Sequence, residues 1–301
     1  MTARVAVVQF PGVNCEAETA RALRCAGLEA AIVPWTAGRA TLAAFDAYVL
    51  PGGFSYQDRV RAGAVAGRHE LLDTVRRRAE AGVPVLGICN GALVLVEAGL
   101  VPGAAEPAAG AAAAAGPGVA LAPNRMPDRT GYLARWVWCQ IEPTRSLFTQ
   151  AYAPGEIVPL PMAHAEGRFT TATPEQWARL EAGGQVTVRY ARSAAAPPGA
   201  APGDHFPWNP NGSLGDAAAL GNARGNVLAL MPHPERAQDL VQVPLDLPGD
   251  WGERRRRVPA GGLSPWSRGP GAGIFLSLAA ALGASPRTGT DADGAQCESA
   301  P

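Results

Sequence analysis

Apolar runs alternate with helix-like segments along the first hundred residues of the chain. Short runs rich in β-branched and other apolar residues predict strands at 4–10, 29–34, 44–50 and 83–88. The segment 68–81 has the spacing of a helix with one buried face, and helices are also expected at 15–26 and from about Asn90. Continuous apolar strands separated by helices are typical of a parallel sheet covered on both faces. The pattern therefore predicts a doubly wound, mostly parallel α/β fold.

The rest of the chain is less regular. Strand patterns return at 135–141, 156–162, 185–191 and 227–231. The segment 104–120 is almost entirely Ala, Gly and Pro, and Gly, Pro and Arg are frequent from about 238 to 270. A last helix is expected at 271–282, and 284–301 has the composition of a disordered tail. We predict a single domain over 1–283, with insertions at about 104–120 and 238–270.

Composition narrows the classes of function. The 301 residues carry 26 basic and 26 acidic side chains, and this balance gives no support for a nucleic-acid or anionic-membrane partner. Every basic residue is an arginine, which excludes catalysis through a lysine Schiff base or a phosphate-loop lysine. No apolar run reaches the roughly 18 residues that a membrane span requires. We expect a small ligand or a protein partner.

The cysteines lack the paired spacing of zinc sites and of disulfide frameworks. There are five of them: Cys15, Cys25, Cys89, Cys139 and Cys297. We expect no metal site and a reducing, cytoplasmic location, since the first residues also lack the pattern of a signal peptide. Only Cys89 stands where chemistry is expected, and the other four are interpreted as structural or incidental.

Cys89 lies in the segment GICNG, at the predicted turn between a buried strand and a helix. Such a turn lifts a nucleophile out of the sheet, and Gly87 and Gly91 leave space on either side of it. The helix N-terminus lowers the pKa of a thiol, and the N–H of Asn90 points to where an oxyanion would form. The PGGF turn after another strand would supply a second N–H, from Gly53. The arrangement predicts acyl transfer through a thiolate.

A cysteine nucleophile needs a base, and the base needs an orienting group. Four histidines are available: His69, His164, His205 and His233. His233 ends a predicted strand in LALMPHPER, and Glu235 would share its side of an extended chain, which Pro234 favours. A cysteine at a strand end is by itself more often a small buried residue without chemistry, and an HxE pair by itself is common. Together with PGGF, the two favour a triad of Cys89, His233 and Glu235. His164 is a candidate for a supporting or interface position.

These motifs resemble those of the class I, triad-type glutamine amidotransferases. Six segments in sequence order resemble, more narrowly, the small glutaminase subunits of phosphoribosylformylglycinamidine synthases: FPGVNCEAETARAL, FSYQDRVRAGAVA, ARWVW, PMAHAEGRF, NPNGS and GNVLALMPHPERA. The resemblance covers about 4–237 and the last helix, and it implies a flavodoxin-like domain that hydrolyses glutamine. It also implies an oxyanion hole at Gly53 and Asn90, and substrate contacts at Gly52 and at the position of Leu93.

The resemblance also implies partners. In this family the ammonia passes to a large, ATP-using synthetase subunit, which converts formylglycinamide ribonucleotide to its amidine in purine synthesis. A small third subunit commonly bridges the two. We therefore expect glutamine as the substrate, no cofactor in this chain, and ATP and magnesium used by the partner. The absence of lysine fits this division, because the phosphate chemistry belongs to the other subunit.

One departure from the family pattern keeps alternatives open. The family usually has a glutamine four residues after the nucleophile, where this chain has Leu93, which cannot hydrogen-bond a substrate. A catalytically weakened regulatory or scaffold subunit of the same complex is therefore an alternative. The glutaminase subunit of pyridoxal phosphate synthase is another, disfavoured by NPNGS and AHAEG. A third is another amidotransferase-like cysteine hydrolase, and Glu235 speaks against it because that group usually lacks the HPE arrangement.

Overall fold

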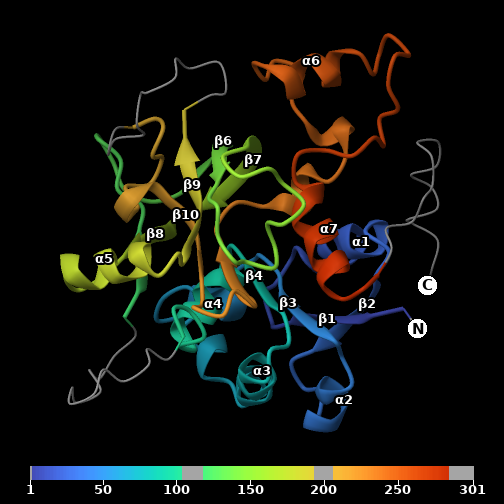
Figure 1. The fold of residues 1–301 in the computed structure, drawn as a ribbon. Helices are drawn as coiled ribbons and strands as arrows, with labels where there is room; N and C mark the ends of the chain where they lie inside the picture. The colour runs from blue at the N-terminus through green and yellow to red at the C-terminus, as the bar shows by residue number, and fades with distance from the viewer. Residues whose placement is uncertain (1, 104–117, 193–205, 285–301) are drawn as a thin grey trace.

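A nine-stranded mixed sheet forms the centre of the molecule in the computed structural model, which describes residues 2–103, 118–192 and 206–284 (Figure 1). Across the sheet the strands are β2 (Glu29–Pro34), β1 (Arg4–Gln9), β3 (Ala47–Leu50), β4 (Val85–Ile88), β11 (Val227–Leu230), β10 (Ala217–Gly221), β9 (Val186–Ala191), β6 (Leu133–Ile141) and β7 (Ile157–His164). A separate two-stranded sheet pairs β5 (Ala120–Pro123) with β8 (Glu166–Thr170). Most of the Ala-rich insertion and the predicted tail lie outside the described residues.

The five strands from β2 to β11 are parallel. All residues of β3, β4 and β11 are buried, as their uninterrupted apolar sequences require. Helices cover both faces of this half: α1 (Glu16–Cys25), α2 (Arg39–Ala43), α3 (Leu71–Glu80), α4 (Asn90–Glu97) and α7 (Ala272–Ala281). Figure 1 shows α1 and α7 together on one face, with α3 and α4 on the other. The predicted doubly wound α/β fold is confirmed.

The other half of the sheet, from β10 to β7, is antiparallel. Its strands β6, β7 and β9 follow the predicted runs, and α5 (Pro174–Ala182) begins with a capping box in which Thr173 and Gln176 each accept from the other's backbone N–H. Strand β10 was not predicted. Its sequence, AAALG, has no β-branched residue, and it forms a strand because it pairs with β11 and β9 in the sheet interior.

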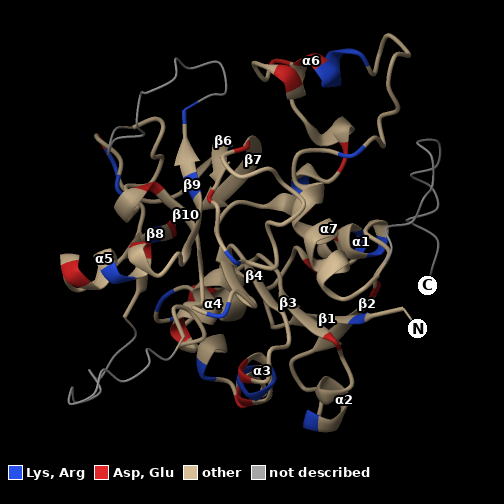
Figure 2. Cartoon of the chain, viewed as in Figure 1, with Lys and Arg blue, Asp and Glu red and all other residues tan. Residues whose placement is uncertain are grey.

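The predicted loop insertion at 238–270 has a small core of its own. It contains α6 (Asp250–Arg256), and its buried side chains Leu240, Val243 and Leu247 pack against Trp136 and Trp138 of β6 and against Trp251, Val258 and Leu263. Figure 2 shows the basic run of α6 at the edge of the molecule. Two of its arginines are used inside the segment: Arg255 and Arg256 donate to the carbonyls of Val243, Leu245 and Leu247.

Among the described residues, no helix is long and apolar enough to cross a membrane.

Candidate active site

Four loops meet at the carboxyl edge of the parallel strands, where ligands bind in open α/β sheets. Cys15 follows β1, Gly52 and Gly53 follow β3, Cys89 follows β4, and His233 follows β11. The sheet order places β1, β3, β4 and β11 next to one another. Segments far apart in the sequence are thereby brought to one site.

The nucleophile turn is strained. Cys89 has φ +51° and ψ −107°, a backbone conformation that residues with a side chain seldom adopt, and α4 begins at the next residue. A Cβ on Gly91 would lie 1.9 Å from the Leu50 carbonyl oxygen, and one on Gly87 would lie 2.5 Å from the Gly91 carbonyl oxygen. These glycines therefore allow β3, β4 and α4 to approach closely. This packing requirement adds to the predicted role of leaving space beside the nucleophile. The thiol is buried, with the Ala163 carbonyl oxygen 3.7 Å from Sγ.

His233 and Glu235 form a buried pair. Nδ1 of His233 lies 2.6 Å from Oε1 of Glu235, and the two residues are 2% and 1% exposed. The backbone N–H of His233 donates to the Pro161 carbonyl at 2.8 Å, which fixes the loop against β7. The chain is not extended here as expected: Pro234–Ala237 form a 3-10 helix. Glu235 meets the imidazole because this turn brings it back, not because the residues alternate along a strand.

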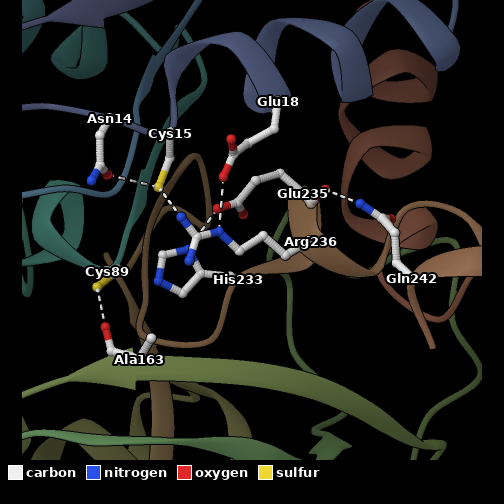
Figure 3. A network of polar contacts seen from close by, with 9 residues as sticks. All are labelled: Asn14, Cys15, Glu18, Cys89, Ala163, His233, Glu235, Arg236 and Gln242. Atoms are coloured by element: carbon white, nitrogen blue, oxygen red, sulfur yellow. Dashed lines mark hydrogen bonds and ion pairs between the residues drawn. The ribbon is translucent and has the colours of Figure 1, made fainter. Parts of the chain in front are cut away.

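The charges around His233 favour its protonated form. Burial alone lowers the pKa of this imidazole, but the nearby Glu235 carboxylate and the Cys89 sulfur outweigh burial and raise the pKa well above its ordinary value. The Glu235 contact places the Nδ1 proton on the carboxylate side, and Nε2 is buried without a hydrogen-bond partner among the described residues. In Figure 3 the ring lies between Glu235 and Cys89. Transfer of the Cys89 proton to Nε2 gives the thiolate and imidazolium pair that these charges favour.

Two backbone N–H groups are available beside the nucleophile. Within the described residues, neither Gly53 nor Asn90 donates its N–H to a protein acceptor. Gly53 has φ +143°, and a Cβ there would lie 2.7 Å from the Asn14 nitrogen, so the turn requires glycine. The Asn90 side chain accepts from Ser55 N–H at 3.2 Å and donates to Asp58 at 3.1 Å. It thereby ties the PGGF turn to the start of α4.

The predicted substrate contacts have other neighbours in the structure. A Cβ on Gly52 would lie 2.7 Å from Cε1 of His233 and 3.1 Å from Sγ of Cys15. The absence of a side chain at Gly52 therefore leaves room for the imidazole. Leu93 is buried in α4, one helical turn after Cys89, and lies against Gly63. The roles of Gly52 and Leu93 in substrate binding stay predictions.

Cys15 belongs to the site, although its sequence context predicted a structural or incidental cysteine. Its side chain is fully buried, and burial raises the pKa of its thiol, an effect that His233 and Arg236 partly offset. Nη2 of Arg236 lies 3.0 Å from Sγ, and Nε of Arg236 lies 2.8 Å from Glu18 (Figure 3). The available signal was its position: Cys15 follows the first predicted strand, at the same sheet edge as PGGF and GICNG.

A second buried histidine, His164, ends β7 nearby. Its Nδ1 lies 3.1 Å from Oδ1 of Asn124, whose amide nitrogen donates to the carbonyls of Gly131 and His164. Burial and the charge of His233 lower the pKa of His164 to about 3. Asn211 of the NPNGS segment donates to the Gly167 carbonyl and holds the adjoining turn. His164 thus lies beside the site with a neutral ring, and its supporting or interface role stays a prediction.

Comparisons with known proteins show the family of this chain. The sequence profile of a family described as a CobB/CobQ-like glutamine amidotransferase domain matches residues 2–267. The phosphoribosylformylglycinamidine synthase subunit PurQ of Methanothrix thermoacetophila is 39% identical over 284 residues, covering 91% of this chain and 96% of that protein. The PurQ subunit of Thermus thermophilus is 42% identical over 238 residues, covering 79% and 91%.

Solved structures are similar to this chain as well. A chain from the structure of PurLQS from Thermotoga maritima is similar with a TM-score of 0.66 and 28% sequence identity, covering 94% of this chain and 100% of that chain. The glutaminase domain of Trypanosoma brucei CTPS, solved with bound acivicin, has a TM-score of 0.51 at 14% identity, which shows a shared fold only.

Proposed function

Because this chain belongs to the PurQ family of phosphoribosylformylglycinamidine synthase subunits, within the glutamine amidotransferases, we propose that it is the glutaminase subunit of that synthase. It hydrolyses glutamine to glutamate and ammonia for purine biosynthesis. The observation that carries this proposal is the buried 2.6 Å contact between His233 and Glu235, beside the strained turn of Cys89.

The first half of the reaction forms a thioester. Nε2 of His233 accepts the Cys89 proton, and the thiolate attacks the side-chain amide carbon of glutamine. The N–H groups of Gly53 and Asn90 donate to the oxyanion of the tetrahedral intermediate. When the intermediate collapses, Nε2 returns its proton to the departing nitrogen, and ammonia leaves.

The second half releases glutamate. His233 accepts a proton from water, the hydroxide attacks the thioester carbon, and the same proton then restores the Cys89 thiol. Glu235 keeps the Nδ1 proton on its own side throughout and stabilises the imidazolium that forms twice in each cycle. This is why the carboxylate matters although it never touches the substrate.

The partners follow from the same family. We propose that the ammonia passes to a large synthetase subunit, which uses ATP and magnesium to convert formylglycinamide ribonucleotide to its amidine, and that a small subunit bridges the two. The similarity to a chain of T. maritima PurLQS supports this assembly. This chain needs no cofactor of its own for the thioester chemistry, and we place the complex in the cytoplasm.

The test compares glutamine- and ammonia-dependent synthesis by the assembled complex, with ATP and formylglycinamide ribonucleotide. Cys89→Ala should lower glutamate release by roughly 10⁴-fold or more, as nucleophile removal does in triad enzymes, and should leave ammonia-dependent synthesis intact. Cys25→Ser in α1 is the matched control and should retain both. Equal loss of both activities in Cys89→Ala would contradict a role in ammonia supply.

The same experiment tests the scaffold alternative, which was raised because Leu93 stands where the family usually has glutamine. If the wild-type complex uses ammonia but releases no glutamate from glutamine, the subunit has kept the fold and lost the chemistry. Release that depends on Cys89 excludes a scaffold that has lost the chemistry.

A further inference from the structure

Three side chains of the kinds that bind zinc meet at the imidazole of His233. Sγ of Cys15, a ring nitrogen of His233 and a carboxylate oxygen of Glu235 all lie within 4.8 Å of one another, and all three residues are buried. Thiolate, imidazole and carboxylate are the ordinary protein ligands of Zn²⁺. We propose that Cys15, His233 and Glu235 form an inhibitory zinc site, with water as the fourth ligand.

The distances require only a small adjustment. Donor atoms around a tetrahedral Zn²⁺ lie about 3.5 Å apart, given zinc–nitrogen and zinc–oxygen bonds near 2.1 Å and zinc–sulfur bonds near 2.3 Å. The donors here are within 4.8 Å, with His233 and Glu235 at 2.6 Å, so the sulfur moves inward and the hydrogen bond opens. Oε2 of Glu235 is buried without a hydrogen-bond partner among the described residues, which leaves a lone pair for a metal.

The charges nearby suit a bound cation despite Arg236. Zn²⁺ with one thiolate and one carboxylate is neutral, and the Arg236 guanidinium is already paired with Glu18 at 2.8 Å. Nη2 of Arg236, 3.0 Å from Sγ of Cys15, stabilises the thiolate and can go on donating to the sulfur when it binds metal. Outer hydrogen bonds of this kind orient ligands in zinc sites.

Zinc binding releases two protons, one from Cys15 and one from His233, and fixes the remaining imidazole proton on Nε2. The Cys15 thiol, which donates to Asn14 at 3.3 Å, loses its proton to solvent as the sulfur–zinc bond forms. The protonated His233 loses its Nδ1 proton to solvent as Nδ1 binds the metal, and it keeps the proton on Nε2. Nε2 can then no longer accept the Cys89 proton. This inhibitory effect rests on the proposed glutaminase function, whereas metal binding itself does not.

The experiment uses Co²⁺ as a probe, because a thiolate ligand gives it a charge-transfer absorption band. The full-length Cys89→Ala chain, which lacks the nucleophile, should show this band at one Co²⁺ per chain and lose it when Zn²⁺ displaces the cobalt. Adding Cys15→Ser should abolish the band and weaken Zn²⁺ binding more than about 100-fold, since losing even an outer partner costs 10–100-fold. Adding Cys25→Ser instead should change neither.

A second variant keeps the test decisive if Cys15→Ser fails to fold. Glu235→Gln in the Cys89→Ala chain should keep the band but bind Zn²⁺ at least about 10-fold more weakly, since an amide is a poor zinc ligand. A band absent from Cys89→Ala would show that Cys15 does not bind the metal, and a band retained after Cys15→Ser would assign the thiolate to another cysteine. Either result would overturn the site. Unchanged affinity in the Glu235→Gln chain would remove the carboxylate from the ligand set.

The inhibitory effect has its own measurement. Zn²⁺ at the concentration that displaces cobalt should stop glutamate release by the wild-type complex. Zinc that binds without slowing release overturns the inhibition but leaves the site. A metal-free complex that never releases glutamate refutes the proposed function instead, and the cobalt result stands independently.

Discussion

The site contains two buried histidines, His233 and His164, and they differ in the side chain that contacts Nδ1 of the ring. The partner of His233 is the Glu235 carboxylate at 2.6 Å, and that of His164 is the neutral Asn124 amide at 3.1 Å. Each ring also packs against a glycine, Gly52 for His233 and Gly167 for His164. Burial and packing of the two rings are thus alike, and the charge of one partner separates them.

The consequence is opposite protonation. Burial lowers the pKa of both imidazoles, but only His233 has negative charges that more than offset it. His164 stays neutral, and the positive charge of His233 lowers its pKa further, to about 3. One histidine is therefore suited to exchange protons with a substrate, and the other to hold a loop.

The largest effect is expected from removing the charge that distinguishes the two. Glu235→Gln leaves His233 with an amide partner, as His164 has, and should lower the glutaminase kcat by roughly 10³- to 10⁴-fold through loss of the tautomer and of imidazolium stabilisation. Glutamate release by the complex measures this.

Ammonia-dependent synthesis by the Glu235→Gln complex is the control and should not change. A glutaminase rate within threefold of wild type would mean that the partner's charge does not separate the two histidines.

The two glycines give the next contrast. A Cβ would lie 2.7 Å from Cε1 of His233 in Gly52→Ala and 2.2 Å from Cε1 of His164 in Gly167→Ala. Either overlap should lower the free energy of unfolding by about 1–3 kcal/mol. Only Gly52→Ala moves the base, and it should lower kcat by roughly 10²-fold.

Urea unfolding and glutamate release, measured on both variants, decide this comparison. Equal losses of kcat would show that His164 takes part in the chemistry, contrary to a holding role.

The smallest effect is a pH dependence of stability. Because the folded-state pKa of His164, about 3, lies below the unfolded value near 6.5, protonation favours the unfolded chain, and stability falls as pH drops below about 6.5. The raised pKa of His233 acts with the opposite sign, since its contribution is lost as pH rises.

Between pH 7 and 5.5 the His164 contribution is about 1 kcal/mol. His164→Gln should lose that much less stability over this interval than wild type, as measured by urea unfolding at both pH values. Parallel losses in the two proteins would show that His164 is not held neutral.

The sequence predicts the parallel half of this molecule well and the antiparallel half less well. Strands such as β4 are continuous apolar runs with a turn at each end, whereas β10 is alanine-rich and becomes a strand only through its neighbours in the sheet. In the site, GICNG and HPE carry local signals of chemistry. Cys15 has no chemical motif of its own. Its position after the first strand indicates the right edge of the sheet, but its place beside His233 depends on strand order, which no local pattern encodes.

Strand order has a further consequence during synthesis of the chain. β11 lies in the middle of the sheet, between β4 and β10, yet it is the last strand in sequence. A nascent chain that has not reached residue 230 therefore presents two open strand edges, and such edges invite pairing with other chains. The same late insertion delivers His233. A ribosome-bound chain therefore has Cys89 without its base, and it completes the catalytic pair and the continuous sheet in a single event.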